Sequence, residues 1–308
     1  MAASNTSELA ILDTSRLVAI AKVDSAMTSP NFDGFDPEFD NFDVVCQKEA
    51  IGSSARAMRA ILNQLRARPG LVTTYAKFTN VPPEIAELKL SKGCRQLYDA
   101  GNRYLLITVP GVPHERAVGQ FQTFLTLSLE AAGIVLLVVN GVSGRVEGTQ
   151  SSKEPDGSWF PKSIPPGRSR TWPSVVLEVG VSESRKKLRA DATWWLANSQ
   201  GEVNIVILIS INRTIAEVIF ESVVLEQPPI YMRNGRRQYR PHTRQSIKVT
   251  RLPGGAGQPV TTVPSTSPLT ITIEEIMCRP PNPTEANPVI PISLLEAIAG
   301  DIWDAQGL

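Results

Sequence analysis

Two acidic residues, Asp156 and Glu178, have the type and surroundings that metal chemistry requires. Glu178 lies in the middle of the apolar run 174–182, and Asp156 follows Pro155, which disfavours a helix there. An unpaired carboxylate in an apolar strand is costly to bury, so Glu178 needs a cation, a proton or a water-filled cleft. If the strand that carries Asp156 lies beside it, the two carboxylates can bind Mg²⁺ and leave positions open for water. This arrangement suits reactions at phosphate groups.

The elements that must position these acids follow from hydrophobic periodicity. Side chains alternate between the two faces of a strand, so Glu178 and Gly180 share a face opposite Val179. A helix is predicted to begin at Pro113 and end at Gly133. The remaining expected elements are strands at 104–109, 134–139, 156–160 and 174–182, a helix at 184–198, and strands at 203–211 and 216–224. Strands flanked by helices on this scale predict an α/β layer structure.

Pro155-Asp156, followed after a gap by Glu178 in an apolar strand, resembles the PD-(D/E)XK nuclease superfamily, which has the restriction-endonuclease-like fold. The likeness extends over about residues 104–220. The run EVGVSES and the tryptophan-ended helix after it are similar to a large group of proteins classed with restriction endonucleases. The resemblance implies an αβββαβ core that binds Mg²⁺ at Asp156 and Glu178, with Glu115 as an additional acid. It also implies metal-dependent hydrolysis of DNA phosphodiester bonds.

The chain departs from the family motif at one position. The family has a lysine two residues after the second acid, and this chain has Gly180. In the family that lysine polarises the attacking water or stabilises developing negative charge. Lys187 on the following helix is the first substitute, and Lys186 the second. The alternative is that Lys187 pairs with Asp191, four residues later on the same helix.

Charge is distributed unevenly outside this core. The segment 227–273 contains no acid, and tyrosines lie between its arginines, which suits contact with the phosphates and bases of DNA or RNA. The predicted nucleic-acid contacts are Arg233, Arg236, Arg237, Arg240 and Arg244. The alternatives are a solvated hairpin, or an internal partner for the acidic N-terminal segment.

The N-terminal segment 1–44 is expected to be an acidic, disordered tail. Its four phenylalanines recur at helical spacing and are either a short motif for a protein partner's groove or part of a solvated tail: Phe32, Phe35, Phe39 and Phe42. We expect residues 45–103 to form a helical extension, with an amphipathic helix at 55–68. Residues 104–225 are expected to form the core, and residues 226–308 a β and irregular extension with a basic hairpin, a linker and a terminal helix.

Composition gives a broad frame. The 308 residues are 42% hydrophobic and carry a formal net charge of +1, which suits a globular chain and names no partner. Three widely spaced cysteines predict no disulfide framework, and no run is long enough to span a membrane, so we expect a soluble intracellular protein. Two functions remain open: a Mg²⁺-dependent nuclease, or an inactive protein of nuclease fold that binds nucleic acid or a protein partner.

Overall fold

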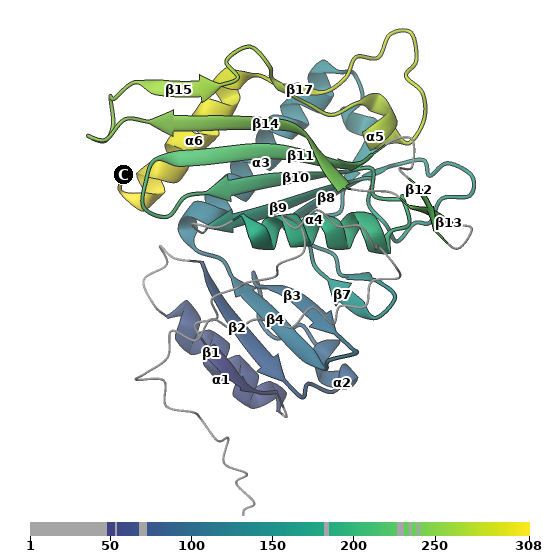
Figure 1. Ribbon diagram of the computed structural model, residues 1–308, viewed down its shortest axis with the longest axis vertical. Helices are drawn as coiled ribbons and strands as arrows, with labels where there is room; N and C mark the ends of the chain where they lie inside the picture. Colours follow the sequence, from purple (N-terminus) through teal and green to yellow (C-terminus); the bar gives the residue numbers. More distant parts are fainter. Residues whose placement is uncertain are drawn as a thin grey trace, which may run out of the picture.

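The computed structural model describes residues 48–52, 54–67, 73–181, 185–226, 231–233, 236–238 and 241–308. Two large mixed β-sheets dominate this part of the chain, and helices lie on their faces (Figure 1). The predicted tail with Phe32, Phe35, Phe39 and Phe42 lies outside the described residues. The described residues confirm the mixed α/β class.

The first sheet, sheet A, is built from the N-terminal half of the described chain (Figure 1). Its strands, in spatial order, are β1 (Lys48–Ile51), β2 (Thr74–Thr79), β4 (Tyr104–Val109), β3 (Arg95–Asp99), β7 (Ser151–Lys153) and β6 (Val146–Glu147). Helix α1 (Ala55–Arg66) covers one face, because its apolar stripe packs on the alternate residues of β2 and β4 that face it. The short helix α2 (Pro83–Ala86) packs into the same core.

The second sheet, sheet B, has strands from the rest of the chain. Their spatial order is β15 (Val260–Val263), β14 (Pro241–Arg251), β11 (Glu217–Leu225), β10 (Ile205–Ile211), β9 (Val175–Val181), β8 (Gly157–Pro161) and β5 (Val138–Asn140). Strands β9 and β10 are parallel, and the other neighbours are antiparallel. Both faces of β9 and β10 are buried, which explains their nearly continuous apolar sequences.

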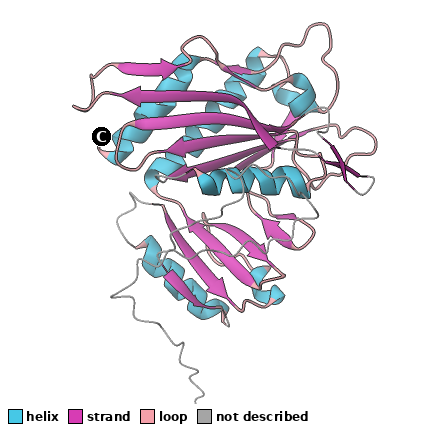
Figure 2. Cartoon of the chain, viewed as in Figure 1, coloured by secondary structure: helices cyan, strands magenta, loops and turns pink. Residues whose placement is uncertain are grey.

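Helices cover both faces of sheet B. Helix α4 (Lys186–Asn198) packs on the face that carries Val176 and Val206, and in Figure 1 it lies on the side of sheet B that faces sheet A. The opposite face, which carries Val175 and Leu177, packs on α3 (Val112–Ala131), α5 (Ile273–Met277) and α6 (Ile292–Gln306). Figure 2 shows this layering as helices in front of and behind the larger sheet.

Several element predictions are found in the structure. Helix α3, strand β9, helix α4 and strand β10 all lie where hydrophobic periodicity places them. The chain runs α3, β5, β6, β7, β8, β9, α4, β10, and β6 and β7 of this series belong to sheet A. The first strand of that series is shorter than expected. Residues 134–139 begin as a 3₁₀ turn, Val135–Leu137, and only Val138 and Val139 belong to β5.

The division at 103/104 differs from the observed architecture. Strand β4 pairs with β2 and β3, so it belongs to sheet A and not to the expected core. The expected helical extension 45–103 contains the three strands β1, β2 and β3 beside its helices. Near the C-terminus, the extension that was expected to hold a linker contains strand β15 and the short helix α5.

Three smaller features complete the described fold. Strands β12 (Tyr231–Arg233) and β13 (Arg236–Gln238) form an antiparallel pair, and β16 (Leu269–Thr270) pairs with β17 (Val289–Ile290). Both described cysteines, Cys94 and Cys278, are free. Among the described helices, none is long and apolar enough to cross a membrane.

Gly180 has a specific packing reason in this fold. It lies on the α4 face of β9, where Leu188 of α4 fills the space above it. A Cβ atom at residue 180 would lie 2.9 Å from Leu188 Cγ. The absence of the motif lysine therefore coincides with close packing of Leu188 on the strand, and no side chain fits there unless Leu188 moves.

We expect Gly180→Ala to destabilise the protein by about 1–3 kcal/mol, because the added methyl overpacks the contact with Leu188. Gly119→Ala is the matched control, since a Cβ at this exposed glycine of α3 meets no atom within 4 Å. Denaturant unfolding measures both variants. A Gly180→Ala protein as stable as the wild type would contradict this account of the glycine.

Candidate active site

A narrow cleft separates sheet A from α4 and the adjoining end of β9. It has a volume of about 20 Å³, little more than one water molecule needs. Both predicted acids line it, together with side chains from β3, β4 and α4 and from the segment between β7 and β8. The sequence-predicted pair Asp156 and Glu178 thus faces one shared space.

Asp156 is held beside β9 by backbone hydrogen bonds. Strand β8 pairs with β9 only as far as Gly157 and Leu177, so the next β9 amide needs another acceptor. The Asp156 N–H donates to the Leu177 carbonyl at 3.1 Å, and the Val179 N–H donates to Asp156 Oδ2 at 2.8 Å. The carboxylate therefore extends the ladder where β8 ends, next to Glu178.

Two cations from other elements contact the Asp156 carboxylate. Arg95 of β3 places Nε 3.1 Å from Oδ1, and His114 of α3 places Nε2 3.2 Å from Oδ2. Burial favours the neutral acid, but His114 and Arg95 outweigh it and hold the pKa of Asp156 below its usual range. Burial opposes the charge on His114, yet the Asp156 and Glu115 carboxylates raise the pKa of that imidazole to about 9.

Glu178 has a different environment. The Trp195 indole N–H of α4 donates to its Oε1 at 2.6 Å, and Lys153 Nζ of β7 lies 3.0 Å from the same oxygen. Burial is the main cause that raises the pKa of Glu178, to about 7. The Asp191 and Asp156 carboxylates add to this effect, and the Lys153 ammonium opposes it. Near neutral pH this carboxyl group is therefore poised between its two protonation states.

The structure pairs Lys187 with Asp191, in agreement with the alternative weighed for that lysine. Lys187 Nζ lies 2.6 Å from Asp191 Oδ2, and the ammonium also lies 5.7 Å from the centre of the Tyr75 ring. Burial lowers the pKa of Lys187, but the Asp191 carboxylate outweighs it and raises that pKa. Lys187 does line the cleft, but the ammonium that contacts Glu178 is that of Lys153.

Glu115 lies at the edge of this cluster. Its side chain is 51% exposed, and its Oε1 is 3.5 Å from His114 Nδ1 and 3.9 Å from Arg95 Nη2. It contacts the two cations of Asp156 rather than the cleft that the two acids share. A role for Glu115 as a metal ligand stays a prediction.

The described part of the basic segment contacts the protein itself. Arg244 hydrogen-bonds to Glu275 and to the Thr270 carbonyl, and Lys248 lies 3.7 Å from Glu217. Arg233, Arg236 and Arg237 lie in β12 and β13, where only the backbone is described, and Arg240 lies outside the described residues. Nucleic-acid contact by this segment therefore stays a prediction.

Sequence reasoning missed four residues of the cluster: Arg95, His114, Lys153 and Trp195. The sequence could have indicated Lys153 as a site residue, because it stands three residues before Asp156, in a segment where Pro155 disfavours a helix. For His114, a role as proton carrier or metal ligand was weighed against a packing or hydrogen-bonding role, and the latter was preferred. Arg95 comes from β3, in the segment expected to be helical, so its approach to Asp156 had no sequence signal.

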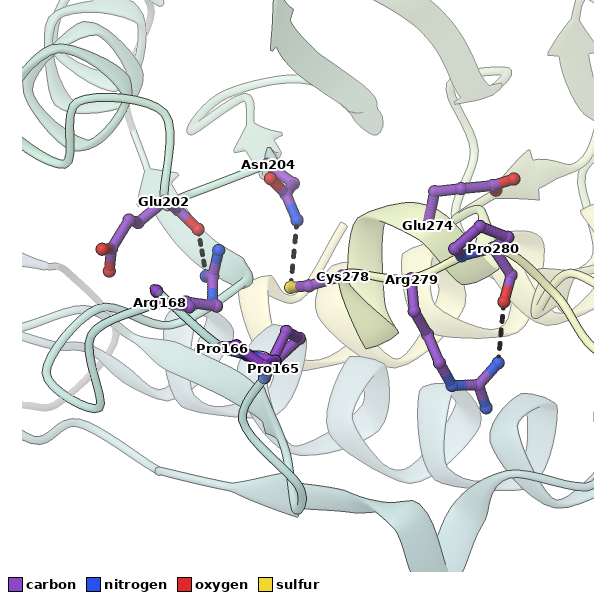
Figure 3. A pocket seen from close by; sticks show the side chains of 10 residues that line it. Pro165, Pro166, Arg168, Glu202, Asn204, Glu274, Cys278, Arg279 and Pro280 are labelled. Atoms are coloured by element: carbon purple, nitrogen blue, oxygen red, sulfur yellow. Dashed lines mark hydrogen bonds between the residues drawn. The ribbon is translucent and has the colours of Figure 1, made fainter.

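A larger hollow of about 520 Å³ lies elsewhere, between the 165–168 loop and the end of α5 (Figure 3). In Figure 3 Asn204 donates to Cys278 Sγ at 3.3 Å, and Arg168 bonds to the Glu202 carbonyl. Burial raises the pKa of the Cys278 thiol, so it is not an activated nucleophile. We place the candidate active site in the smaller cleft, because that is where buried charged groups with strongly shifted pKa values meet.

The donor chemistry of the cleft fits Mg²⁺. Two carboxylates share one space, and Asp156 Oδ1 is buried without a hydrogen bond. In the described arrangement, however, no three His, Cys, Asp or Glu side chains lie close enough to hold a metal ion. The places beside both acids are taken by Arg95, His114 and Lys153.

Comparison with known proteins identifies no family for this chain. No family model and no curated protein matches the chain. A solved structure that does match is "a putative nuclease belonging to DUF820" from Anabaena variabilis ATCC 29413. The two are 16% identical over 45% of this chain and 80% of that chain, with a TM-score of 0.29. A likeness this low carries no argument.

The pKa shift of His114 predicts how stability depends on pH. The folded imidazole keeps its proton up to about pH 9 and the unfolded one up to about 6.5, so its stabilisation is present below 6.5 and lost as pH rises through 9. We expect a loss of roughly 3 kcal/mol at most. The raised pKa of Glu178 also makes the folded state less stable as pH rises. Its contribution to stability is present below pH 4.5 and is lost as pH rises to about 7.

Urea unfolding at pH values between 7 and 9 measures the His114 effect in the wild type and in His114→Gln. The wild type should lose stability across this window, and the variant should show a much smaller slope. A wild-type stability that stays level or rises with pH would contradict the raised pKa of His114.

Proposed function

We propose that the protein is a nuclease that hydrolyses phosphodiester bonds at the cleft around Asp156 and Glu178. The observation that carries the proposal is the convergence of both acids on one space, with the Lys153 ammonium 3.0 Å from Glu178. The order of the elements in sheet B and on its faces, α3, β5, β8, β9, α4, β10, is a further support, because the resemblance to the PD-(D/E)XK superfamily implies this succession, although β6 and β7 of sheet A interrupt it.

Each residue would have a definable part in the reaction. A water molecule adds to phosphorus, the phosphorus–oxygen ester bond breaks, and the leaving oxygen takes up a proton. Asp156 and Glu178 would hold Mg²⁺, which when bound supplies Lewis-acid stabilisation of charge on the phosphate oxygens. The pKa of Glu178 without an ion is about 7, so at neutral pH this carboxyl group must lose its remaining proton before it can hold the ion. Lys153 provides positive charge beside the acids, the role that the family gives to the lysine that Gly180 replaces.

The size of the cleft adds a requirement. Asp156 and Glu178 are almost fully buried, and about 20 Å³ does not admit a nucleotide. Sheet A must therefore shift relative to α4 before a phosphodiester can reach the acids. The side chains that line this seam are paired ions, and their contacts can exchange for contacts with phosphate.

One group of contacts favours a second function, binding of nucleic acid without cleavage. Leu188 fills the place of the motif lysine, and the buried acids are already paired with the chain's own cations. In that case the wild type would bind DNA with salt-dependent affinity and leave it intact with Mg²⁺ or Mn²⁺ present.

The direct test is cleavage of plasmid and single-stranded DNA by the full chain with Mg²⁺ or Mn²⁺. We expect Asp156→Asn and Glu178→Gln each to lower the rate by roughly 100-fold or more, because each removes a carboxylate that would hold the metal ion. Glu285→Gln is the matched control. It makes the same change in a carboxylate that pairs with Arg279, outside the cleft. Cleavage that survives both cleft substitutions would remove this site.

A further inference from the structure

Lys153 is the cation that contacts Glu178 in the cleft. Its Nζ lies 3.0 Å from Glu178 Oε1 and 2.5 Å from Asp191 Oδ1, and its side chain is only 5% exposed. The same Glu178 oxygen already accepts the Trp195 N–H. A carboxylate oxygen has about two lone-pair sites, and Trp195 and Lys153 already occupy those of Oε1. An ion that binds this oxygen must therefore displace one of the two.

The charges of the cleft lead to the same conclusion. Every acid among the described residues that line it has a Lys or Arg within 4 Å. The acids are Glu154, Asp156, Glu178 and Asp191, and the cations are Lys89, Arg95, Arg145, Lys153 and Lys187. A divalent ion would add two positive charges to a cluster that is already neutralised. One of these cations must therefore leave when the ion binds.

Lys153 is the cation whose departure would free Glu178 for an ion. It extends from β7 of sheet A, whereas both of its partners belong to the other side of the cleft, in β9 and α4. Lys187 stays beside Asp191 on the same helix, so Asp191 keeps a counter-ion when Lys153 moves away. Glu178 would then be the acid left with an unbalanced charge.

We propose, on the basis of the proposed function, that Lys153 and a divalent cation compete for Glu178, so that Lys153 weakens ion binding by the resting protein. Lys153 is in this sense a positioning residue and not a ligand. Its removal should strengthen ion binding, whereas removal of a ligand weakens it. The two roles therefore predict changes of opposite sign in the same measurement.

The test is titration calorimetry of the full chain with Mn²⁺, comparing the wild type with Lys153→Met. We expect the variant to bind Mn²⁺ more tightly by roughly 10- to 100-fold, the range that changes around a metal site produce. An unchanged or weaker Mn²⁺ affinity in Lys153→Met would overturn the proposal.

Three further variants test whether the gain in Mn²⁺ affinity arises from the contact between Lys153 and Glu178. Lys89→Met makes the same change in another sheet A lysine that pairs with a buried acid, Glu154, and should leave Mn²⁺ affinity unchanged. Lys153→Arg keeps the positive charge and should not tighten binding. Lys153→Met/Glu178→Gln should lose the gain, because the acid is gone. An equal gain in Lys89→Met would show a general charge effect and also overturn the proposal.

If Lys153→Met is unstable, thermal melting gives a second measurement of Mn²⁺ binding. Mn²⁺ should raise the melting temperature of this variant by more than it raises that of the wild type, because the ion replaces the missing charge. The readout is ion binding and not cleavage. Tight Mn²⁺ binding by Lys153→Met, with no cleavage by the wild type, would support this inference and remove the nuclease proposal.

Discussion

Neutralisation of buried carboxylates across the seam between the two sheets is the constraint on which this structure depends. Asp156 and Glu178 lie at sheet B with almost no contact with water, where an unpaired charge is very costly. Sheet A supplies the opposing charges, through Arg95 of β3 and Lys153 of β7. Sheet A is therefore both the cover of the cleft and the source of its cations, and its position relative to sheet B sets the electrostatics of the site.

Helix α4 provides the third wall of the cleft and fixes the orientation of the acids. Its Trp195 places an indole N–H on Glu178, while its Leu188 presses against β9 at Gly180. The helix also contributes Asp191, which draws Lys153 and Lys187 together. This one helix thus combines apolar packing with the placement of charged groups. A change in its packing would directly alter the hydrogen bond and ion pair of Glu178.

The sequence predicted the parts of the site that depend on local pattern. Alternation along β9 correctly placed Glu178 on the face opposite Val179, and the spacing of Lys187 and Asp191 indicated their ion pair. Other contacts joined residues far apart in the chain. Arg95 and His114 reach Asp156 from β3 and α3, and no periodicity encodes such a meeting. Apart from β4, the strands of sheet A were missed, because short segments such as Arg95–Asp99 mix polar and apolar residues without strict alternation.

The chain enters sheet A twice. It forms β1 to β4 first, leaves to build α3 and β5, and returns for β6 and β7 before it reaches Asp156. Strand β3 pairs with both β4 and β7, so it joins the strands that precede α3 to those that follow β5. A fragment that began at Tyr104 would keep β4 and β7 but lose β2 and β3, so β4 would lose both of its neighbours and β7 one of its two. The segments that form sheet A and those that carry the two acids therefore alternate along the chain, so neither part can be separated by a single cut.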